Sequence, residues 1–387
     1  MKNPRDIKRR IKIVLVTPRL TMGGAERLLI DIAKQLDCRR YEIYWCALEP
    51  TSDEASNWQQ EIIAAGIPFR VLASDKRSPY KIGRLWRLVK IAFRLWHYLR
   101  EIRPDIMQTQ LFADLYRPVG RLARVPIIIG IEHNLDYDEP PLFQWVKRRC
   151  HFTADSLVAV SRVVRQDVIK RYGYSPKKVV VIYNGIDETK FYRPLSGSKV
   201  YGSQSLWCFG SAGRLVEQKG FDILIQALAQ LPSEIKWQCQ IAGAGPFQND
   251  LNNLIKSLNL ENRVSLIGTC SDMRQFFSQL DILIIPSRWE GLGLVALEAG
   301  AARVPVIASA TGGLQEIIRH RYSGFLVENI QPETLTKALE HILVRGEARE
   351  LSVWANNLQR EVMNHFTMAQ TVSHYEQYYE RIITEKN

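Results

Sequence analysis

Two carboxylates, Glu290 and Glu298, form the most informative pair of side chains in this sequence. They lie eight positions apart in the segment 286–298. Eight residues span about 12 Å along a helix axis, which is too far for carboxylates that must flank one glycosidic bond in a hydrolase. The spacing instead suits the two ends of a long ligand, such as the sugar and the ribose of a nucleotide sugar. The alternatives are a helix-start carboxylate and a surface helix residue.

A basic pair precedes the two carboxylates in the chain. Arg214 and Lys219 lie in the loop 213–220, which follows an apolar run and begins and ends with glycine. Arginine can donate two parallel hydrogen bonds to phosphate oxygens, and lysine supplies a compact positive charge. We therefore expect the pair to bind a diphosphate, with a solvated basic turn as the alternative.

Backbone groups in two loops complete a candidate anion site. Gly23 and Gly24 follow the first apolar run and open a helix, where glycine lets a ligand approach the backbone closely. The alternative is a plain strand-to-helix turn. The amides of Leu294 and Val295, at the start of the helix that carries Glu298, are expected to be free to receive a phosphate.

His133 is a further candidate because it lies at the end of a strongly apolar run, 127–131. Ligands of parallel α/β sheets bind at the carboxyl ends of the strands. A histidine there could face the reacting carbon, and the alternative is a structural role.

Two patterns resemble cofactor or metal motifs without the context that these motifs need. Gly291, Gly293 and Ala296 have the spacing of a dinucleotide fingerprint, but the next strand ends in Ser-Ala-Thr at 309–311 instead of an acidic residue that could hold the ribose. Residues 136–138 read Asp-Tyr-Asp, like the cation-binding motif of metal-dependent glycosyltransferases, but they lie far in sequence from the phosphate-type loops. We therefore expect neither NAD nor a metal ion.

These loops connect alternating apolar strands and helices. The first half has expected strands at 11–16, 43–47, 127–131, 157–160 and 179–182, and helices at 25–36 and 113–123. The second half has expected strands at 207–212, 237–242, 264–267, 282–285 and 306–308, helices at 221–230, 248–258, 293–302 and 333–343, and a final helix at 367–383. The alternation predicts an α/β protein with two Rossmann-like, doubly wound domains facing a cleft, joined by a linker at 193–205.

The charge is distributed unevenly between the halves. The net charge is +12, of which residues 1–194 contribute +14 and the rest −2. A basic half suggests an anionic partner such as a membrane, a phosphorylated acceptor or nucleic acid, but no nucleic-acid module is recognisable. The six cysteines form no CxxC motif, and no apolar run is long enough to span a bilayer. We expect reduced thiols and a cytoplasmic location.

Taken together, these loops resemble the GT-B retaining glycosyltransferases of family 4, also called glycosyl transferases group 1. Six motifs occur in the family's order and cover nearly the whole chain. They are Gly23-Gly24-Ala25-Glu26, Asn184-Gly185-Ile186-Asp187, Gly213-Arg214-Leu215 with Lys219-Gly220, Gly243-Ala244-Gly245-Pro246, Glu290 with Glu298, and Gly312-Gly313 with Glu316.

The resemblance implies a role for each candidate in the second half. The donor-binding residues would be Gly213, Arg214, Lys219, Gly243, Leu294, Val295 and Glu298. Of these, Arg214 and Lys219 would hold the diphosphate and stabilise its leaving charge, and Glu298 would hold the ribose hydroxyls. Glu290 would contact the hydroxyls of the donor sugar.

For the first half, the resemblance implies an acceptor domain at 1–194, followed by a nucleotide-sugar domain at 195–365. A helix at 366–387 would cross back to the first domain. Gly23 and Gly24 would let the first domain close on the diphosphate and acceptor, and His133 would lie near the anomeric carbon.

The reaction expected from the resemblance is transfer of a sugar from a UDP- or GDP-sugar with retention at the anomeric carbon. No metal or other cofactor is expected, and the acceptor would be lipid-linked or a polysaccharide in cell-surface glycan synthesis. The open alternatives are a nucleotide-sugar epimerase or a glycosyl phosphorylase of the same fold, and a non-catalytic glycan-binding relative.

One further segment, 76–100, is cationic, rich in tryptophan and apolar at helical spacing. Such a helix can lie in a bilayer interface with its basic side chains on anionic headgroups. The alternative is a domain helix whose apolar side faces the core. Because the first half is basic, we favour peripheral contact with the inner face of the membrane.

Overall fold

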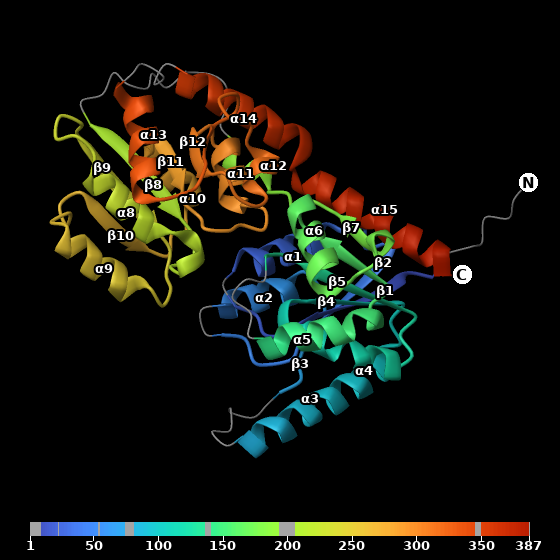
Figure 1. Cartoon of the computed structure of the whole chain (residues 1–387). Coiled ribbons are helices and arrows are strands. Elements are labelled where there is room, and N and C mark those ends of the chain that lie inside the picture. The colour runs from blue at the N-terminus through green and yellow to red at the C-terminus, as the bar shows by residue number, and fades with distance from the viewer. Residues whose placement is uncertain are drawn as a thin grey trace, which may run out of the picture. The chain divides into compact units, whose positions relative to one another are not determined.

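The computed structural model of the chain contains two compact units (Figure 1). The structure describes residues 9–21, 23–52, 55–73, 81–135, 141–192, 206–344 and 350–386. One unit comprises Met1–Tyr183 with Thr371–Asn387, and the other comprises Asn184–Gln370. The linker expected at 193–205 and the Asp-Tyr-Asp at 136–138 lie outside the described residues.

The first unit contains a parallel sheet in the order β3-β2-β1-β4-β5-β6-β7. The order turns back at β1, which pairs with both β2 and β4, so the sheet is doubly wound. Its strands are β1 (Ile11–Thr17), β2 (Tyr41–Ala47), β3 (Phe69–Val71), β4 (Ile106–Gln110), β5 (Ile127–Glu132), β6 (Ser156–Ala159) and β7 (Val179–Val181).

Helices connect these strands and cover the sheet (Figure 1). The α-helices are α1 (Gly24–Gln35), α2 (Ser56–Ala64), α3 (Lys81–Ile102), α4 (Arg117–Leu122), α5 (Pro141–Cys150) and α6 (Arg162–Tyr172). Short 3-10 helices are η2 (Leu111–Tyr116), η3 (His151–Thr153) and η4 (Pro176–Lys178). The single helix expected at 113–123 is instead η2 followed by α4. The break fits Pro118 in the first turn of α4, since proline lacks an N–H and starts helices more readily than it continues them.

The second unit repeats the plan with a parallel sheet in the order β10-β9-β8-β11-β12-β13. Its strands are β8 (Trp207–Ala212), β9 (Trp237–Ala242), β10 (Val264–Gly268), β11 (Ile282–Ile285), β12 (Val306–Ser309) and β13 (Phe325–Val327). Its helices are α7 (Glu188–Phe191), η5 (Glu217–Lys219), α8 (Phe221–Ala229), α9 (Gln248–Ser257), α10 (Met273–Gln279), α11 (Leu294–Ala301), α12 (Leu314–Ile317), α13 (Pro332–Val344) and α14 (Leu351–His365).

The two parallel α/β sheets confirm the fold class expected from the alternation of strands and helices. In both sheets the central strands are buried along most of their length, as expected when helices cover both faces. Strands β3, β4 and β13 were not expected, and helices α2, α5, α6, α10, α12 and α14 were not among those named from the sequence. β3 and β13 have only three residues each, which is too short for a recognisable strand pattern. β4 carries the polar residues Gln108, Thr109 and Gln110, so it lacks the apolar run that identified the other strands.

The last helix, α15 (Met368–Lys386), belongs from Thr371 onward to the first unit. The hydroxyl of Tyr379 donates a 2.6 Å hydrogen bond to Oε1 of Gln108 in β4, and Lys386 pairs with Asp155 at 2.7 Å. The division between units therefore lies at Tyr183 and Gln370, whereas the sequence suggested boundaries after residues 194 and 365.

A buried charged cluster stabilises the first unit next to β4. The guanidinium of Arg117 lies 2.5 Å from the Asp114 carboxylate and donates to the Thr109 and Tyr174 hydroxyls at 2.9 and 2.7 Å. Both charged residues are buried. Each partner therefore depends on the other, because an unpaired buried charge is costly.

We expect Arg117→Leu to lower the free energy of unfolding by about 3–5 kcal/mol, because it leaves the Asp114 carboxylate buried without its charge partner. Urea unfolding followed by circular dichroism measures the change. Arg39→Leu is the matched control, since Arg39 pairs with Asp37 on the exposed surface, where solvent screens the pair and its loss should have little effect on stability. Equal losses in the two variants would contradict the role given to the Arg117 cluster.

Candidate functional site

The candidate site of the second unit begins in the loop between β8 and α8. Gly213 follows β8, and Gly220, with φ of 63°, opens α8 from the left-handed region. Between them the chain makes the 3-10 turn η5, which ends in Lys219. Arg214 is exposed and has no side-chain partner within the described residues. The loop therefore presents one unpaired cation at the carboxyl end of a central strand, where ligands of such sheets bind.

Lys219 is held by the carboxylate of Glu290. The Lys219 Nζ lies 2.6 Å from Glu290 Oε2, and the Ser287 hydroxyl donates to the same oxygen at 3.2 Å. Glu290 is buried at the end of the loop that follows β11, and Lys219 is half-buried. This contact joins two residues that the sequence assigned to separate roles, and it places a fixed ammonium at the edge of the sheet.

The loops around this pair pack backbone against backbone. Gly243, after β9, has φ of 143°, and a Cβ there would lie 1.9 Å from the Gly213 carbonyl oxygen. Gly312, after β12, has φ of 53°, and a Cβ there would lie 1.8 Å from the Glu290 carbonyl oxygen. A side chain at Gly243 would push the loop after β9 away from the Arg214 loop, and one at Gly312 would push the loop after β12 away from the Glu290 loop.

Helix α11 begins directly after the Glu290 loop. Its N-cap, Gly293, is left-handed with φ of 102° and supplies no side-chain cap, and the first turn contains no acidic residue. The amides of Leu294 and Val295 in the first turn lack intrahelical partners, as in any helix. Together with the helix dipole they favour an anion at this end.

Glu298 lies one turn further along α11 and has a different environment. Its carboxylate is half-buried and has no hydrogen-bond or ion-pair partner within the described residues. Burial raises the pKa of Glu298 from 4.5 to about 7. Burial without a partner is unfavourable for the charged form, so the group is suited to accept hydrogen bonds from ligand hydroxyls that replace the lost water.

Three residues that sequence reasoning missed brace the loop of Lys219 against the loop of Glu290. The Arg288 guanidinium donates to the Glu217 carbonyl at 2.8 Å and to both oxygens of Asp222 at 2.8 and 2.6 Å. The Gln218 side chain donates to the Trp289 carbonyl at 3.0 Å. Arg288 and Asp222 are 66 positions apart, and no local pattern in the sequence links residues at that separation.

His133 in the first unit follows β5 and is neutral at physiological pH. Its Nε2–H donates to Gln110 Oε1 at 3.0 Å, which leaves Nδ1 buried and without a hydrogen-bond partner in the described part of the chain. Burial lowers the pKa of His133 to about 4, although the carboxylate of Asp114 opposes the shift. Gln110, at the end of β4, was not recognised from the sequence as a residue that orients this histidine.

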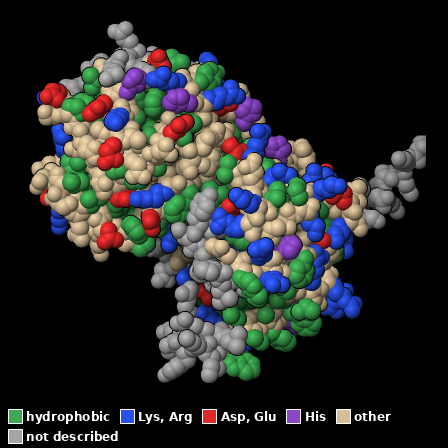
Figure 2. Space-filling model, in the orientation of Figure 1, with side chains coloured by type: hydrophobic (Ala, Val, Ile, Leu, Met, Phe, Trp, Pro, Cys, Tyr) green, Lys and Arg blue, Asp and Glu red, His purple; other side chains and the backbone are tan. Residues whose placement is uncertain are grey.

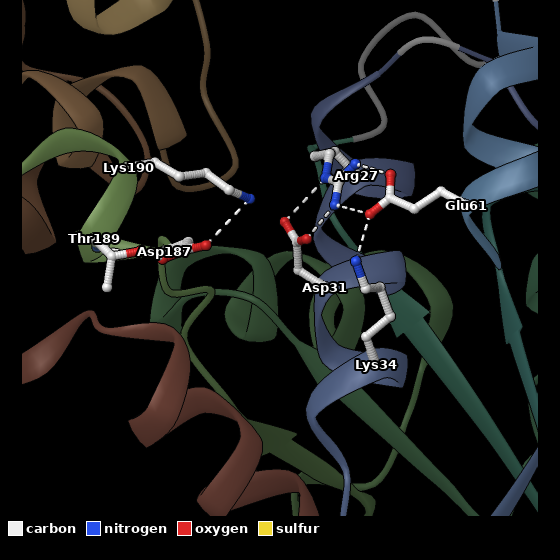
Figure 3. A network of polar contacts seen from close by, with 7 residues as sticks. All are labelled: Arg27, Asp31, Lys34, Glu61, Asp187, Thr189 and Lys190. Atoms are coloured by element: carbon white, nitrogen blue, oxygen red, sulfur yellow. Dashed lines mark hydrogen bonds and ion pairs between the residues drawn. The ribbon is translucent and has the colours of Figure 1, made fainter. Parts of the chain in front are cut away.

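Gly23 and Gly24 begin α1, with Gly23 as the N-cap in an extended conformation. Beyond this turn, ion pairs tie α1 to α2 (Figure 3). Arg27 bonds to Asp31 and lies 2.7 Å from Glu61, and Lys34 lies 2.6 Å from the same Glu61. The network holds the helix that carries the glycine turn in place.

The Asp187 carboxylate, which ends the expected Asn-Gly-Ile-Asp motif, caps helix α7. It accepts hydrogen bonds from the Thr189 amide and hydroxyl at 3.2 and 2.6 Å and pairs with Lys190 at 3.1 Å (Figure 3). An N-cap bond of this kind explains the residue type at this position.

Within the described residues, no group of three or more His, Cys, Asp or Glu side chains could hold a metal ion. The same residues contain no helix that is both long and apolar enough to cross a membrane. The structure thus places Gly213, Arg214, Lys219, Gly243, Glu290, Leu294, Val295 and Glu298 in the second unit, and Gly23, Gly24 and His133 in the first.

We expect Glu298→Gln to stabilise the protein above neutral pH and to have little effect near pH 4. The folded state binds a proton at Glu298 more tightly than the unfolded chain, with pKa values of about 7 and 4.5. The stability that this group contributes is therefore fully present below the pKa of the unfolded chain and is lost as the pH rises through the pKa of the folded state. The neutral amide avoids the loss, roughly 1–3 kcal/mol at pH 8.

Thermal unfolding from pH 4 to pH 8 measures the difference. Glu261→Gln, at an exposed position of the same unit, is the control and should follow the wild type at every pH. A Glu298→Gln effect that does not vary with pH would show that burial of the carboxylate is not its cause.

Known proteins match both halves of the chain. The Glycosyltransferase Family 4 profile matches residues 22–190, and the Glycosyl transferases group 1 profile matches residues 203–357. The lipopolysaccharide core biosynthesis glycosyltransferase LpsE of Rhizobium meliloti is 34% identical over 339 residues, which cover 84% of this chain and 87% of LpsE.

Other relatives match at lower identity or over a shorter stretch. The UDP-Gal:alpha-D-GlcNAc-diphosphoundecaprenol alpha-1,3-galactosyltransferase of Escherichia coli is 24% identical, with 77% of this chain and 81% of that protein covered. An uncharacterised glycosyltransferase of Methanocaldococcus jannaschii is 30% identical over 54% of this chain, and the match spans only 56% of that relative.

Solved structures share the fold. The structure of Anabaena Alr3699/HepE in complex with UDP and glucose superposes with a TM-score of 0.81 at 22% identity, covering 96% of this chain and 100% of that one. The profiles, the LpsE match over most of both chains and this likeness in fold agree with the motifs. The chain is a GT-B glycosyltransferase and belongs to family 4, the glycosyl transferases group 1.

Proposed function

We propose that this glycosyltransferase moves a sugar from a UDP- or GDP-sugar to a lipid-linked or polysaccharide acceptor in cell-surface glycan synthesis, with retention at the anomeric carbon. The observation that carries the proposal is the Lys219–Glu290 contact at 2.6 Å. It fixes an ammonium and a carboxylate in the unit that also carries Arg214 and the first-turn amides of α11.

The donor diphosphate would bind to Arg214, Lys219 and the amides of Leu294 and Val295. Arg214 is exposed and has no side-chain partner among the described residues, so it can turn towards a phosphate and form two parallel bonds. Glu298 would accept hydrogen bonds from the ribose hydroxyls. Because burial raises the pKa of Glu298 to about 7, a bound ribose would also stabilise the charged form by supplying donors.

Transfer breaks the bond between the anomeric carbon and the diphosphate oxygen and forms a bond from that carbon to the acceptor oxygen. The acceptor proton would go to an oxygen of the departing phosphate on the same face of the sugar, which gives retention. The leaving group gains negative charge, and preorganised cations and amides stabilise such charge effectively. Arg214, Lys219 and the α11 amides would serve this role without a metal ion.

Glu290 would recognise the donor sugar while it positions the lysine. Ser287 and Lys219 share one of its oxygens, Oε2, and its Oε1 would accept from sugar hydroxyls. The neutral His133 would contribute from the first unit. Its Nδ1, which has no hydrogen-bond partner among the residues that the structure describes, would accept a hydrogen bond from a hydroxyl near the anomeric carbon.

The relatives support this substrate class without specifying the sugar. One acts in lipopolysaccharide core biosynthesis, and another transfers galactose from UDP-Gal to a diphosphoundecaprenol-linked sugar. The structure of similar fold holds UDP and glucose. Lipid-linked acceptors of this kind reside in membranes, so we also propose that the protein works in the cytoplasm at the inner face of the membrane, attached peripherally through its basic first unit.

An epimerase or a glycosyl phosphorylase of the same fold would use the same nucleotide or phosphate contacts. Release of free UDP or GDP that depends on an added acceptor separates transfer from both. A non-catalytic glycan-binding relative would have no need for the intact Lys219–Glu290 pair.

We expect Lys219→Ala and Arg214→Ala each to lower turnover by about 10²–10³-fold, because each removes a cation that stabilises the leaving diphosphate. A thermal-shift panel of UDP- and GDP-sugars first identifies the donor that stabilises the wild type. Acceptor-dependent release of the nucleotide from that donor then measures turnover.

Lys256→Ala is the control, since Lys256 is an exposed lysine on α9 of the same unit. Near-normal turnover in either site variant would overturn the proposed role of the basic pair. A wild-type protein that no nucleotide sugar stabilises would overturn the proposed function itself.

We also expect Arg288→Lys and Asp222→Asn each to weaken donor binding about tenfold. A lysine at position 288 cannot form the forked contact with Asp222 that braces the loop of Lys219. An asparagine at position 222 removes the negative charge that Arg288 contacts. Because the two residues act through one contact, the double variant should be no worse than either single variant. Donor Kd and kcat measured separately test this. Additive losses, or an equal loss in the exposed control Arg274→Lys, would contradict a positioning role.

A further inference from the structure

Helix α3 of the first unit has two apolar sides. One side consists of Ile91, Leu95, Tyr98 and Leu99, which are buried in the core with strands of the sheet. This is the ordinary apolar side of a domain helix, and it accounts for only part of the hydrophobic pattern in the segment.

The second apolar side of α3 faces solvent. Trp86 is 63% exposed, Val89 52%, Phe93 65% and Trp96 36%. The spacing of three, four and three residues places these four side chains on one side of the helix. Phe93 and Trp96 stack with ring centroids 6.0 Å apart. Isolated exposed hydrophobic residues are common, but a stripe of large ones over three helical turns indicates a binding surface.

Neighbouring elements add hydrophobic side chains of the same kind. Helix α3 contacts α4, and α4 contacts η3. Leu122 in α4 is 74% exposed, and Phe152 in η3 is 70% exposed. In Figure 2, hydrophobic side chains gather over the part of the first unit where Figure 1 places α3 and α4.

The exposed charge around these hydrophobic residues is mostly positive. On α3, on α5 and at the end of α4 the exposed charged side chains include those of Lys90, Arg94, Arg100, Arg124, Arg148 and Arg149, with Glu101 as the acidic one. Lys90 and Arg100 are exposed on α3 itself, and Arg149 lies over the ring of the exposed Trp145 at 5.4 Å. A surface that combines aromatic residues with unbalanced positive charge is complementary to a layer of anionic headgroups above acyl chains.

We propose that the solvent-facing stripe of α3, formed by Trp86, Val89, Phe93 and Trp96, is the part of this enzyme that inserts into an anionic bilayer surface. The helix lies in the plane of the interface. Its stripe reaches the boundary between headgroups and acyl chains, while Lys90 and Arg100 bind the headgroup phosphates. This inference rests on the proposed function in one respect, namely that a lipid-linked acceptor would bring the enzyme to a membrane.

The composition favours a lipid surface over a protein partner. A protein partner would need an acidic surface matched to these particular cations, whereas any anionic bilayer supplies diffuse negative charge. Tryptophan and phenylalanine next to basic residues are typical of interfacial helices. The opposite side of α3 remains packed in the domain core, so docking requires no unfolding of the first unit.

Co-sedimentation of the full chain with vesicles tests the proposal. The vesicles contain either phosphatidylglycerol mixed with phosphatidylcholine or phosphatidylcholine alone. We expect binding only to the anionic vesicles, with weaker binding as the salt concentration rises. The double variant Trp86→Ser/Phe93→Ser should bind at least about tenfold less, and Lys90→Glu should also bind less.

Matched controls lie on the second unit. Val353 is 54% exposed and Tyr322 47%, so Val353→Ser/Tyr322→Ser removes similar exposed hydrophobic area. Lys256→Glu matches the charge change. Both controls should bind vesicles like the wild type. Thermal unfolding confirms that all four variants are folded, as expected for substitutions at exposed positions.

Three results would overturn the proposal. The first is that the wild type does not bind anionic vesicles, and the second is that the wild type and the stripe double variant bind them equally. The third is that the wild type forms an oligomer in solution whereas the stripe double variant does not. Donor binding by thermal shift is a separate arm. If the protein binds vesicles but no nucleotide sugar, the proposed function is wrong and the proposed membrane surface is supported. If it binds a nucleotide sugar but no vesicles, the proposed membrane surface is wrong and the proposed function is supported.

Discussion

The ion pair between Lys219 and Glu290, 2.6 Å long, is the interaction on which the candidate site depends. It connects the loop after β8 with the loop after β11, two strands that lie side by side in the sheet. The Arg288 brace joins the same two loops, and the close approach of Gly312 packs the loop after β12 against the Glu290 loop. The Lys219 ammonium is therefore held in position and needs little further ordering.

Burial sets the protonation of the other two titratable groups. It raises the pKa of Glu298 to about 7 and lowers the pKa of His133 to about 4. Both shifts favour the neutral form because a low-dielectric environment penalises charge. The two shifts have opposite signs because a carboxyl group is charged when it is deprotonated, whereas an imidazole is charged when it is protonated.

Helix α3 combines structural and surface roles on one element. Its buried side completes the core of the first unit. Its exposed stripe, in which Phe93 is 65% exposed, does not contribute to that core. A helix of this kind lets a domain with an ordinary hydrophobic core also expose aromatic side chains on its surface. Residues 1–194 carry a net charge of +14, and exposed lysine and arginine side chains lie on α3 beside the stripe.

The sequence alone determined the fold class, the family and the loops of the site. Strands such as β8 and β11 are apolar runs, and the glycine and charge patterns of 213–220 and 286–298 are local, so both can be recognised without coordinates. It could not reveal the Lys219–Glu290 pair, the Arg288–Asp222 brace or the orientation of His133 by Gln110. These contacts join residues at the carboxyl ends of neighbouring strands or in the segments that follow those strands, and only the pairing order of the strands brings them together. Likewise, helical periodicity predicted α3, but only packing against the sheet decided which of its two apolar sides is buried and which faces solvent.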